Sequence, residues 1–200
     1  MFNPNKITKI LGATFILVSS NSALAATAAG TVSVTVQNTF NLTQTTAIDF
    51  GTVRAVGDAT NAANIAALVL SPSGTVTTTQ VGASAITSLS TPTAGVFTVD
   101  SAAPFTNLTV SFPADFTLTT TGVPSGAAVF EVDQADWRGL IVGGANDGTT
   151  ISHSGTMQTD ASGGVVLNVG TSLKTDSSAT FTTGYVDQAY TGTYTMTVNY

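Results

Sequence analysis

The last ten residues of the chain, 191–200, read TGTYTMTVNY. Two sets of side chains alternate along them, and the apolar set is Tyr194, Met196, Val198 and Tyr200. Residues two apart lie on the same face of a β-strand, so a strand here has one apolar face and one face of threonine and asparagine. Threonine is β-branched and polar, which suits the solvent side of a half-buried sheet. The stretch predicts a strand whose apolar face is covered by the rest of the protein.

Residues 31–36, near the other end of the chain, read TVSVTV and show the same alternation. Val32, Val34 and Val36 share one face, and threonine or serine occupies the other. We therefore expect residues 31–36 to form the first strand. Any functional interpretation has to explain two alternating strands at opposite ends of the sequence.

Residues 1–25 have the three parts of a secretory signal peptide. Lys6 and Lys9 form a basic start, a short apolar run follows at 10–18, and Ala-Leu-Ala at 23–25 is a small-residue cleavage site. The apolar run is shorter than the roughly 20 residues that cross a bilayer as a helix. We therefore expect cleavage after residue 25 and no membrane span in the mature chain.

Residues 26–200 are long enough for one well-buried domain, with residues 26–37 as an N-terminal extension. Beyond the leader, three basic residues face eleven acidic ones, a formal charge of −8. So few lysines and arginines offer no surface for nucleic acid or anionic lipid. Charged residues are only 8% of the whole chain, so sheet edges lack the charges that usually keep them apart. We expect a secreted protein that passes through the periplasm to the cell surface or an extracellular filament.

The chain contains no cysteine, which excludes disulfides, thiolate metal sites and thiol nucleophiles. Short apolar stretches separated by glycine and proline turns fill most of the sequence. For example, residues 66–70 and 75–81 flank a Ser-Pro-Ser-Gly turn and predict a hairpin. No segment after the leader has a sustained helical period. The pattern predicts an all-β protein, a single immunoglobulin-like or pilin-like antiparallel β-sandwich.

Catalysis has few candidates in this sequence. His153 is the single histidine, so acid–base chemistry near neutral pH has one candidate only. A serine nucleophile on a strained turn is not indicated either, because the Gly-x-Ser-x-Gly pattern is missing. We expect a protein that is not an enzyme and that uses no cofactor.

Two weaker signals point to a ligand. Glu131, Asp133 and Asp136 form an acidic cluster that could offer oxygen ligands to calcium, although their spacing does not match an EF-hand loop. Trp137 could stack on a sugar, although a lone tryptophan more often packs at the edge of a core. Both signals favour an alternative function, a monomeric secreted binding module for glycan or calcium.

The terminal strands carry a sharper hypothesis. The N-terminal extension can leave its own fold and add a strand to a neighbouring copy, with the apolar face of residues 194–200 lining or flanking the acceptor. Three buried valines contribute about 5 kcal/mol, and ordering six residues costs a comparable amount. The contact is therefore marginal unless Phe40 and Leu42 join it. The alternative hypothesis is that both terminal strands pair inside one complete monomeric sandwich.

Several stretches resemble a family of exported bacterial proteins, catalogued as a domain of unknown function, four-four-zero-two in that series. They are YTGTYTMTVNY at 190–200, IDFG at 48–51, VFTV at 96–99 and VVLNVG at 165–170. The resemblance spans roughly the whole mature chain except residues 133–160. It implies a secreted β-sandwich with no assigned activity and no catalytic residues.

The alternating last strand is also distantly similar to the subunits of chaperone–usher pili. This second resemblance implies donor-strand complementation, in which the N-terminal extension of one subunit completes its neighbour. It also implies homo-oligomers and a periplasmic assembly factor, although those subunits often carry a disulfide. We expect a non-enzymatic structural protein, a surface or pilus-like filament subunit.

Overall fold

Strands with one buried and one solvent-facing side make up almost all of the regular structure, as the alternating sequence predicts. The computed structural model describes residues 29–36 and 39–200. The chain divides into two units, residues 1–35 and residues 36–200, and every strand belongs to the second. The predicted leader, residues 1–25, lies outside the described residues.

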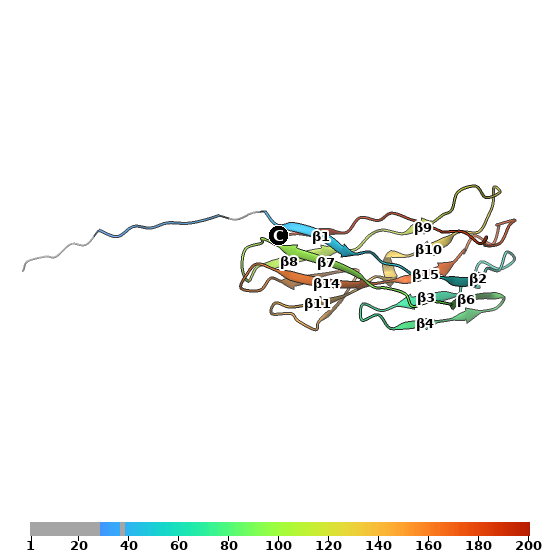
Figure 1. Ribbon diagram of the computed structural model, residues 1–200, viewed down its shortest axis with the longest axis horizontal. Helices are drawn as coiled ribbons and strands as arrows, with labels where there is room; N and C mark the ends of the chain where they lie inside the picture. Colours follow the sequence, from blue (N-terminus) through green and yellow to red (C-terminus); the bar gives the residue numbers. More distant parts are fainter. Residues whose placement is uncertain (1–28, 37–38) are drawn as a thin grey trace, which may run out of the picture. The chain divides into compact units, whose positions relative to one another are not determined.

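The described residues form three antiparallel sheets (Figure 1). The first has eight strands in the order β1 (Asn41–Thr46), β7 (Gly95–Asp100), β14 (Val165–Gly170), β11 (Arg138–Val142), β12 (Thr150–Ser152), β13 (Ser154–Gln158), β8 (Asn107–Ser111) and β16 (Thr197–Asn199). The second has five, in the order β4 (Val76–Thr78), β3 (Ala67–Leu70), β15 (Ser172–Thr175), β10 (Phe130–Val132) and β9 (Phe116–Leu118). The third has three, in the order β2 (Val53–Val56), β6 (Ser84–Ser88) and β5 (Gln80–Val81). One short 3-10 helix, η1, spans Gln134–Asp136.

The predicted all-β antiparallel fold is confirmed, and so are several individual elements. The hairpin expected around the Ser-Pro-Ser-Gly turn is the β3–β4 pair, in which Leu70 lies opposite Val76. Figure 1 shows β1, β7, β8, β11 and β14 toward one end of the second unit, and β2, β3, β4, β6, β9, β10 and β15 toward the other.

The strand predicted at residues 31–36 is wrong for the chain by itself. These residues form neither strand nor helix, and the side chains of Val32 and Val34 are 99% and 86% exposed. A strand needs a neighbour to receive its backbone hydrogen bonds, and no strand of the described residues pairs with this one. The alternation gives residues 31–36 the side-chain pattern of a strand, but a strand also needs a neighbouring strand to pair with.

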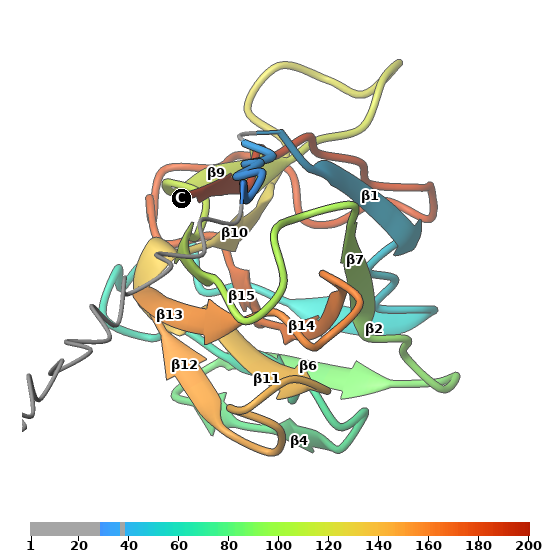
Figure 2. The same ribbon diagram turned by 90° about the vertical axis from the view of Figure 1, so that its left-hand side faces the viewer.

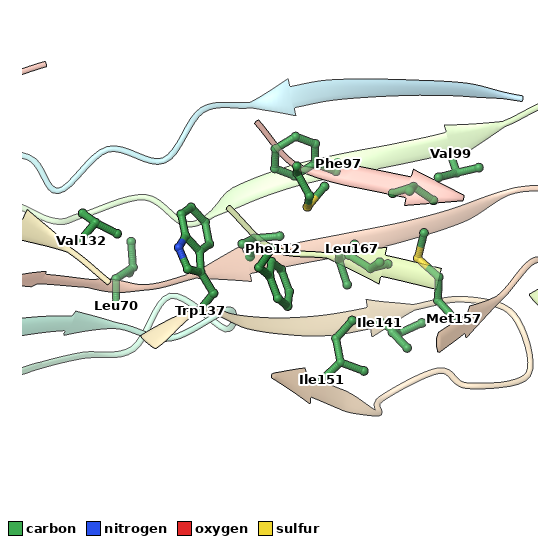
Figure 3. Packing of buried hydrophobic residues seen from close by; sticks show 14 of the residues in the cluster. Leu70, Phe97, Val99, Phe112, Val132, Trp137, Ile141, Ile151, Met157 and Leu167 are labelled. Carbon is green, nitrogen blue, oxygen red and sulfur yellow. The ribbon is translucent and has the colours of Figure 1, made fainter. Parts of the chain in front are cut away.

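The core is one continuous cluster between the sheets (Figure 3). Trp137 is completely buried and stacks on Phe112, with ring centroids 6.0 Å apart. Leu167 and Ile141 come from the neighbouring strands β14 and β11, whereas Leu70 comes from β3 of the second sheet. Each fully buried side chain of this size contributes about 1.5–3 kcal/mol, so packing replaces disulfides as the source of stability.

The connection between β2 and β3 is held by one carboxylate, that of Asp58. Its Oδ1 accepts hydrogen bonds from the hydroxyl and the backbone N–H of Thr60 (2.6 and 2.9 Å), and its Oδ2 accepts one from the amide of Asn64 (2.7 Å). The bond from the Thr60 hydroxyl, followed by that from Asn64, lowers the pKa of Asp58 from 3.8 to about 2. The folded protein therefore favours the charged carboxylate.

We expect this carboxylate to make stability depend on pH in acid. Because the pKa of Asp58 is lower in the folded than in the unfolded chain, its contribution is complete above about pH 4 and is lost as the pH falls toward 2. Asp58→Asn should lower stability at neutral pH, because the amide of Asn64 then faces another amide, and should flatten the curve between pH 4 and 2. Urea unfolding at several pH values measures this. The exposed Asp187→Asn is the control, and equal slopes for both variants would contradict the assignment.

Candidate functional site

One long free edge belongs to the chain from β1 to β2. β1 pairs with β7, Asp49 exchanges two backbone hydrogen bonds with Thr93 (3.0 and 2.7 Å), and β2 pairs with β6. Gly51 has a φ of 68°, a conformation that glycine adopts readily, between these two strands. All of this pairing lies on one side of residues 41–56. Among the described residues the other side has no main-chain partner, so it offers free N–H and C=O groups.

A second free edge belongs to the last residues of the chain. Thr191 pairs with Thr119, and β16 pairs with β8. β1 and β16 are the first and last strands of the eight-stranded sheet, so each has one unpaired side. The sheet curls, and in Figure 2 β1 and the C-terminus both lie in the upper half of the view.

Side chains alone join these two edges along a line that we call the seam, where residues 39–46 face residues 193–200. The rings of Phe40 and Tyr200 lie 5.2 Å apart, and Gln44 Nε2 donates a hydrogen bond to the Tyr194 hydroxyl at 2.9 Å. Paired strands lie about 4.8 Å apart. Here the far ends of long side chains meet instead, and among the described residues no backbone hydrogen bond joins the two segments.

Beyond the seam lies a cavity of about 900 Å³, which we call the edge cavity, between the first free edge and the residues that precede the second. One wall is residues 48–55 and the other is residues 185–190. Apolar side chains from the second sheet also line it, at Leu118, Phe130 and Leu173, and Leu89 lines it from the connection after β6. Charged residues are confined to the two walls: Asp49, Arg54 and Asp187. The edge cavity therefore has an apolar lining between walls that carry charged residues.

Along β2, the backbone N–H and C=O groups of every second residue point away from β6, toward the free side. Leu89 N donates to Thr52 O at 2.8 Å, so these two residues form a hydrogen-bonded pair next to β2. In an antiparallel ladder such pairs alternate with pairs whose backbone groups point outward. Arg54 therefore bonds to β6, whereas the N–H and C=O groups of Val53 and Ala55 point away from it.

Two tyrosines hold the wall at residues 185–190. Tyr185 stacks on Phe130 with centroids 4.3 Å apart, and its hydroxyl donates to Val129 O (3.0 Å) and accepts from Asp176 N (2.7 Å). Burial raises the pKa of Tyr185 above its usual value of 10.0, so the hydroxyl stays protonated and remains a donor. The Tyr190 hydroxyl accepts a hydrogen bond from Val186 N at 3.0 Å. The wall therefore keeps its position through its own side chains.

The C-terminal residues predicted to line an acceptor differ in burial. Met196 and Val198 are buried, Tyr194 is half-buried, and Tyr200 is 47% exposed at the end of the seam. Burial raises the pKa of Tyr194, whose ring packs 6.4 Å from that of Phe97. The regular strand is shorter than the alternation predicts, because only Thr197–Asn199 pairs with β8.

The N-terminal residues predicted to act as donors are all exposed, and Val36 is 72% exposed. Phe40 and Leu42, which were expected to join the donor contact, belong to the unit of residues 36–200. Leu42 lies in β1 opposite Val99, and Phe40 packs on Tyr200. The exposed apolar side chains of residues 31–36 are therefore the three valines alone.

Trp137, predicted as a candidate sugar platform, is part of the core. It is 0% exposed because η1 and the start of β11 turn its ring inward onto Phe112 and Phe116. A buried ring offers no face to a sugar. His153 lies at the turn between β12 and β13 with a φ of 59° and is exposed.

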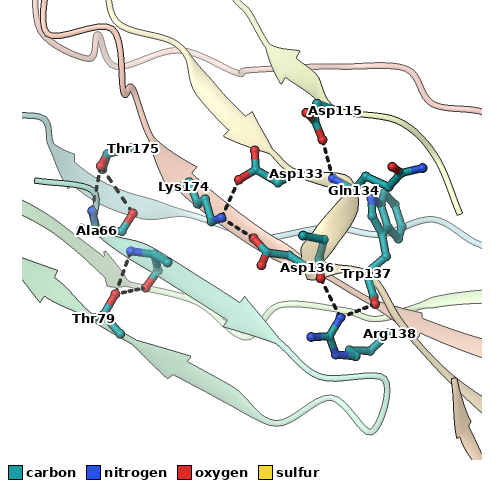
Figure 4. Close-up of polar contacts among 12 residues, drawn as sticks. Ala66, Thr79, Asp115, Asp133, Gln134, Asp136, Trp137, Arg138, Lys174 and Thr175 are labelled. Atoms are coloured by element: carbon teal, nitrogen blue, oxygen red, sulfur yellow. Dashed lines mark hydrogen bonds and ion pairs between the residues drawn. The ribbon is translucent and has the colours of Figure 1, made fainter. Parts of the chain in front are cut away.

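The acidic cluster is occupied by partners within the protein (Figure 4). Lys174 Nζ lies 2.6 Å from an oxygen of Asp133 and 2.7 Å from one of Asp136. Burial works to lower the pKa of Lys174, but the two aspartates outweigh it and raise this pKa. Glu131 accepts hydrogen bonds from the backbone and hydroxyl of Ser177 (3.0 and 2.8 Å). In the part of the chain that the structure describes, no three acidic, histidine or cysteine side chains are grouped to hold a metal ion.

Comparison with protein-family models, with curated proteins and with solved structures found no match. Among the described residues, no helix has the length and apolar character needed to cross a membrane. The resemblances stated from the sequence stay predictions. The edge cavity was missed by sequence reasoning, because its two walls are separated by well over a hundred residues. The sequence features that belong to the cavity walls are Tyr185, Tyr190 and the Ile-Asp-Phe-Gly stretch at 48–51.

The wall at residues 185–190 should depend on one hydroxyl. Tyr185→Phe leaves the N–H of Asp176 without its acceptor, and a buried unsatisfied donor costs about 1–3 kcal/mol. Tyr200→Phe removes the same atom from an exposed side chain whose hydrogen bonds are long, 3.4 Å, and should change stability by less than about 0.5 kcal/mol. Urea unfolding of the two variants measures the difference. Equal losses would show that the Tyr185 hydroxyl does not hold the wall.

Proposed function

We propose that this protein is an exported structural subunit that assembles into a surface filament by β-strand addition. Residues 31–36 of one copy act as the donor, and the free edges of the next copy act as the acceptor. The observation that carries the proposal is the coexistence of these two complementary parts in one chain. Residues 31–36 leave three valines 99%, 86% and 72% exposed, and the first and last strands of the eight-stranded sheet each leave one side unpaired.

The chemistry of the donor fits this role. Exposed valines at every second position leave apolar area in water, and burying each of them contributes about 1.5–3 kcal/mol. The residues between them are Ser33 and flanking threonines, whose side chains tolerate the solvent face of a sheet. No charge is buried when the segment inserts, because residues 31–36 contain none.

The chemistry of the acceptor fits as well. Unpaired edges normally carry lysines or other charges that stop another strand from joining. The charged side chains on the free edge from Asn41 to Val56 are Asp49 and Arg54 only, and residues 191–200 contain no charged side chain. Tyr194, Met196, Val198 and Tyr200 supply apolar side chains beside the seam. In this proposal a periplasmic assembly factor covers the free edges during export, before the next subunit arrives.

The alternative, a monomeric secreted module for glycan or calcium, has less support. Its two candidate sites depend on Trp137 and on the acidic cluster of Glu131, Asp133 and Asp136. The ring is buried in the core, and Lys174 neutralises two of the three carboxylates. The filament proposal uses the three exposed valines and the free sides of the edge strands, which have no main-chain partner among the described residues.

The proposal predicts that assembly depends on the inward face of the donor. Deleting residues 26–37 should abolish polymers of the mature protein without unfolding it. Val34→Asp should do the same, because inserting the donor then buries an unpaired carboxylate, which is strongly unfavourable. Thr35→Asp places the same charge on the solvent face and is the matched control. Light scattering after size-exclusion chromatography, with electron microscopy, measures assembly.

Val34 is exposed in the single chain, so the substitution should leave the fold intact, which circular dichroism checks. Purified mature protein that stays monomeric at all concentrations, with no filaments on cells, would overturn the proposed function. So would polymers that form equally well from the deleted and full-length proteins.

A further inference from the structure

We propose that the donor enters the edge cavity and pairs with the free side of β2, while the seam stays closed by its own side chains. The occupant is residues 31–36 of a second copy of this chain. This inference rests on the proposed function and assigns the docking position within it, at Val53 and Ala55.

The two parts of the facing edges differ in what already fills them. At the seam, Phe40 packs on Tyr200, and Gln44 bonds to Tyr194. A strand inserted there has to displace an aromatic pair and a side-chain hydrogen bond. The edge cavity has about 900 Å³ of unfilled space, near the top of the range for ligand pockets, about 300–1,000 Å³. Docking in the edge cavity therefore displaces less than docking at the seam.

The backbone groups also favour the edge cavity. The N–H and C=O groups of Val53 and Ala55 point away from β6 and have no main-chain partner among the described residues. The opposite wall, residues 185–190, forms no strand, and the Tyr190 hydroxyl already takes the N–H of Val186. An incoming strand therefore pairs with β2 and packs against this second wall.

The dimensions of donor and cavity agree. Six extended residues span about 20 Å, and the eight-residue wall 48–55 spans about 26 Å at 3.3 Å per residue. Alternate side chains of the wall are half-buried, at Ile48, Phe50, Val53 and Ala55. Three valines on one face of the donor meet the apolar lining, and its threonines and serine face the charged groups of the walls.

The donor in this proposal comes from another copy. In their own chain the three donor valines, Val32, Val34 and Val36, are 99%, 86% and 72% exposed, so they do not fill its edge cavity. Each copy then inserts its donor into a neighbour and leaves its own edge cavity free for the next copy.

Hydrogen exchange tests the docking position in full-length mature protein. We expect amides in the fragment 51–57 to exchange roughly tenfold or more slowly in assembled wild-type protein than in monomeric Val34→Asp. The fragment 194–200 should change little, and the central strand at 165–170 is the control that is protected in both. Quenched exchange followed by mass spectrometry of peptic fragments measures all three.

The outcomes separate the two proposals. If assembly protects the amides of fragment 194–200 from exchange, or protects neither 194–200 nor 51–57, docking at β2 is wrong, although the proposed strand addition still holds. Protein that never assembles would overturn both.

A disulfide gives a second measurement, because the natural chain has no cysteine. A Val34→Cys donor mixed with an Ala55→Cys acceptor should form a covalent dimer, and the same donor with a Val198→Cys acceptor should not. The reverse result would assign the donor to β16 instead of β2.

Discussion

Backbone hydrogen bonding along the two facing edges is the constraint on which the rest of this structure depends. Every strand of an antiparallel sheet has two sides, and the first and last strands satisfy one of them only. In this protein the free edge from β1 to β2 faces residues 185–200 without main-chain pairing among the described residues. Sheets that leave two such edges together must close, cover them or receive another strand.

Along the seam, side chains cover the unpaired edges. Aromatic rings and one glutamine bridge the seam, so water and other strands are kept from the apolar face of Met196 and Val198. Beyond the seam the walls remain apart, and the lining of the edge cavity is left without a partner. The edge is closed by side chains at the seam and open at the edge cavity.

Buried polar side chains differ from the backbone groups of the free edges, because nearly all of them have partners within the chain. Asp58 organises the connection after β2, Lys174 joins two aspartates, and the Tyr185 hydroxyl takes both a donor and an acceptor. Such groups fix loops and walls in place. Unused interaction capacity in this protein is concentrated in backbone edges and apolar area, which is what strand addition needs.

The sequence by itself determined the elements and the class of fold. Alternation, β-branched residues and Gly/Pro turns act within a few residues, so the β3–β4 hairpin followed from local pattern. Only the tertiary structure decided which segments meet. Residues 48–55 and 185–190 are brought together by pairing with different sheets, and the burial of Trp137 depends on Phe112 and Phe116 from other strands. Residues 31–36 show the same division, because alternation prepares a segment to be a strand, but only a neighbouring edge can make it one.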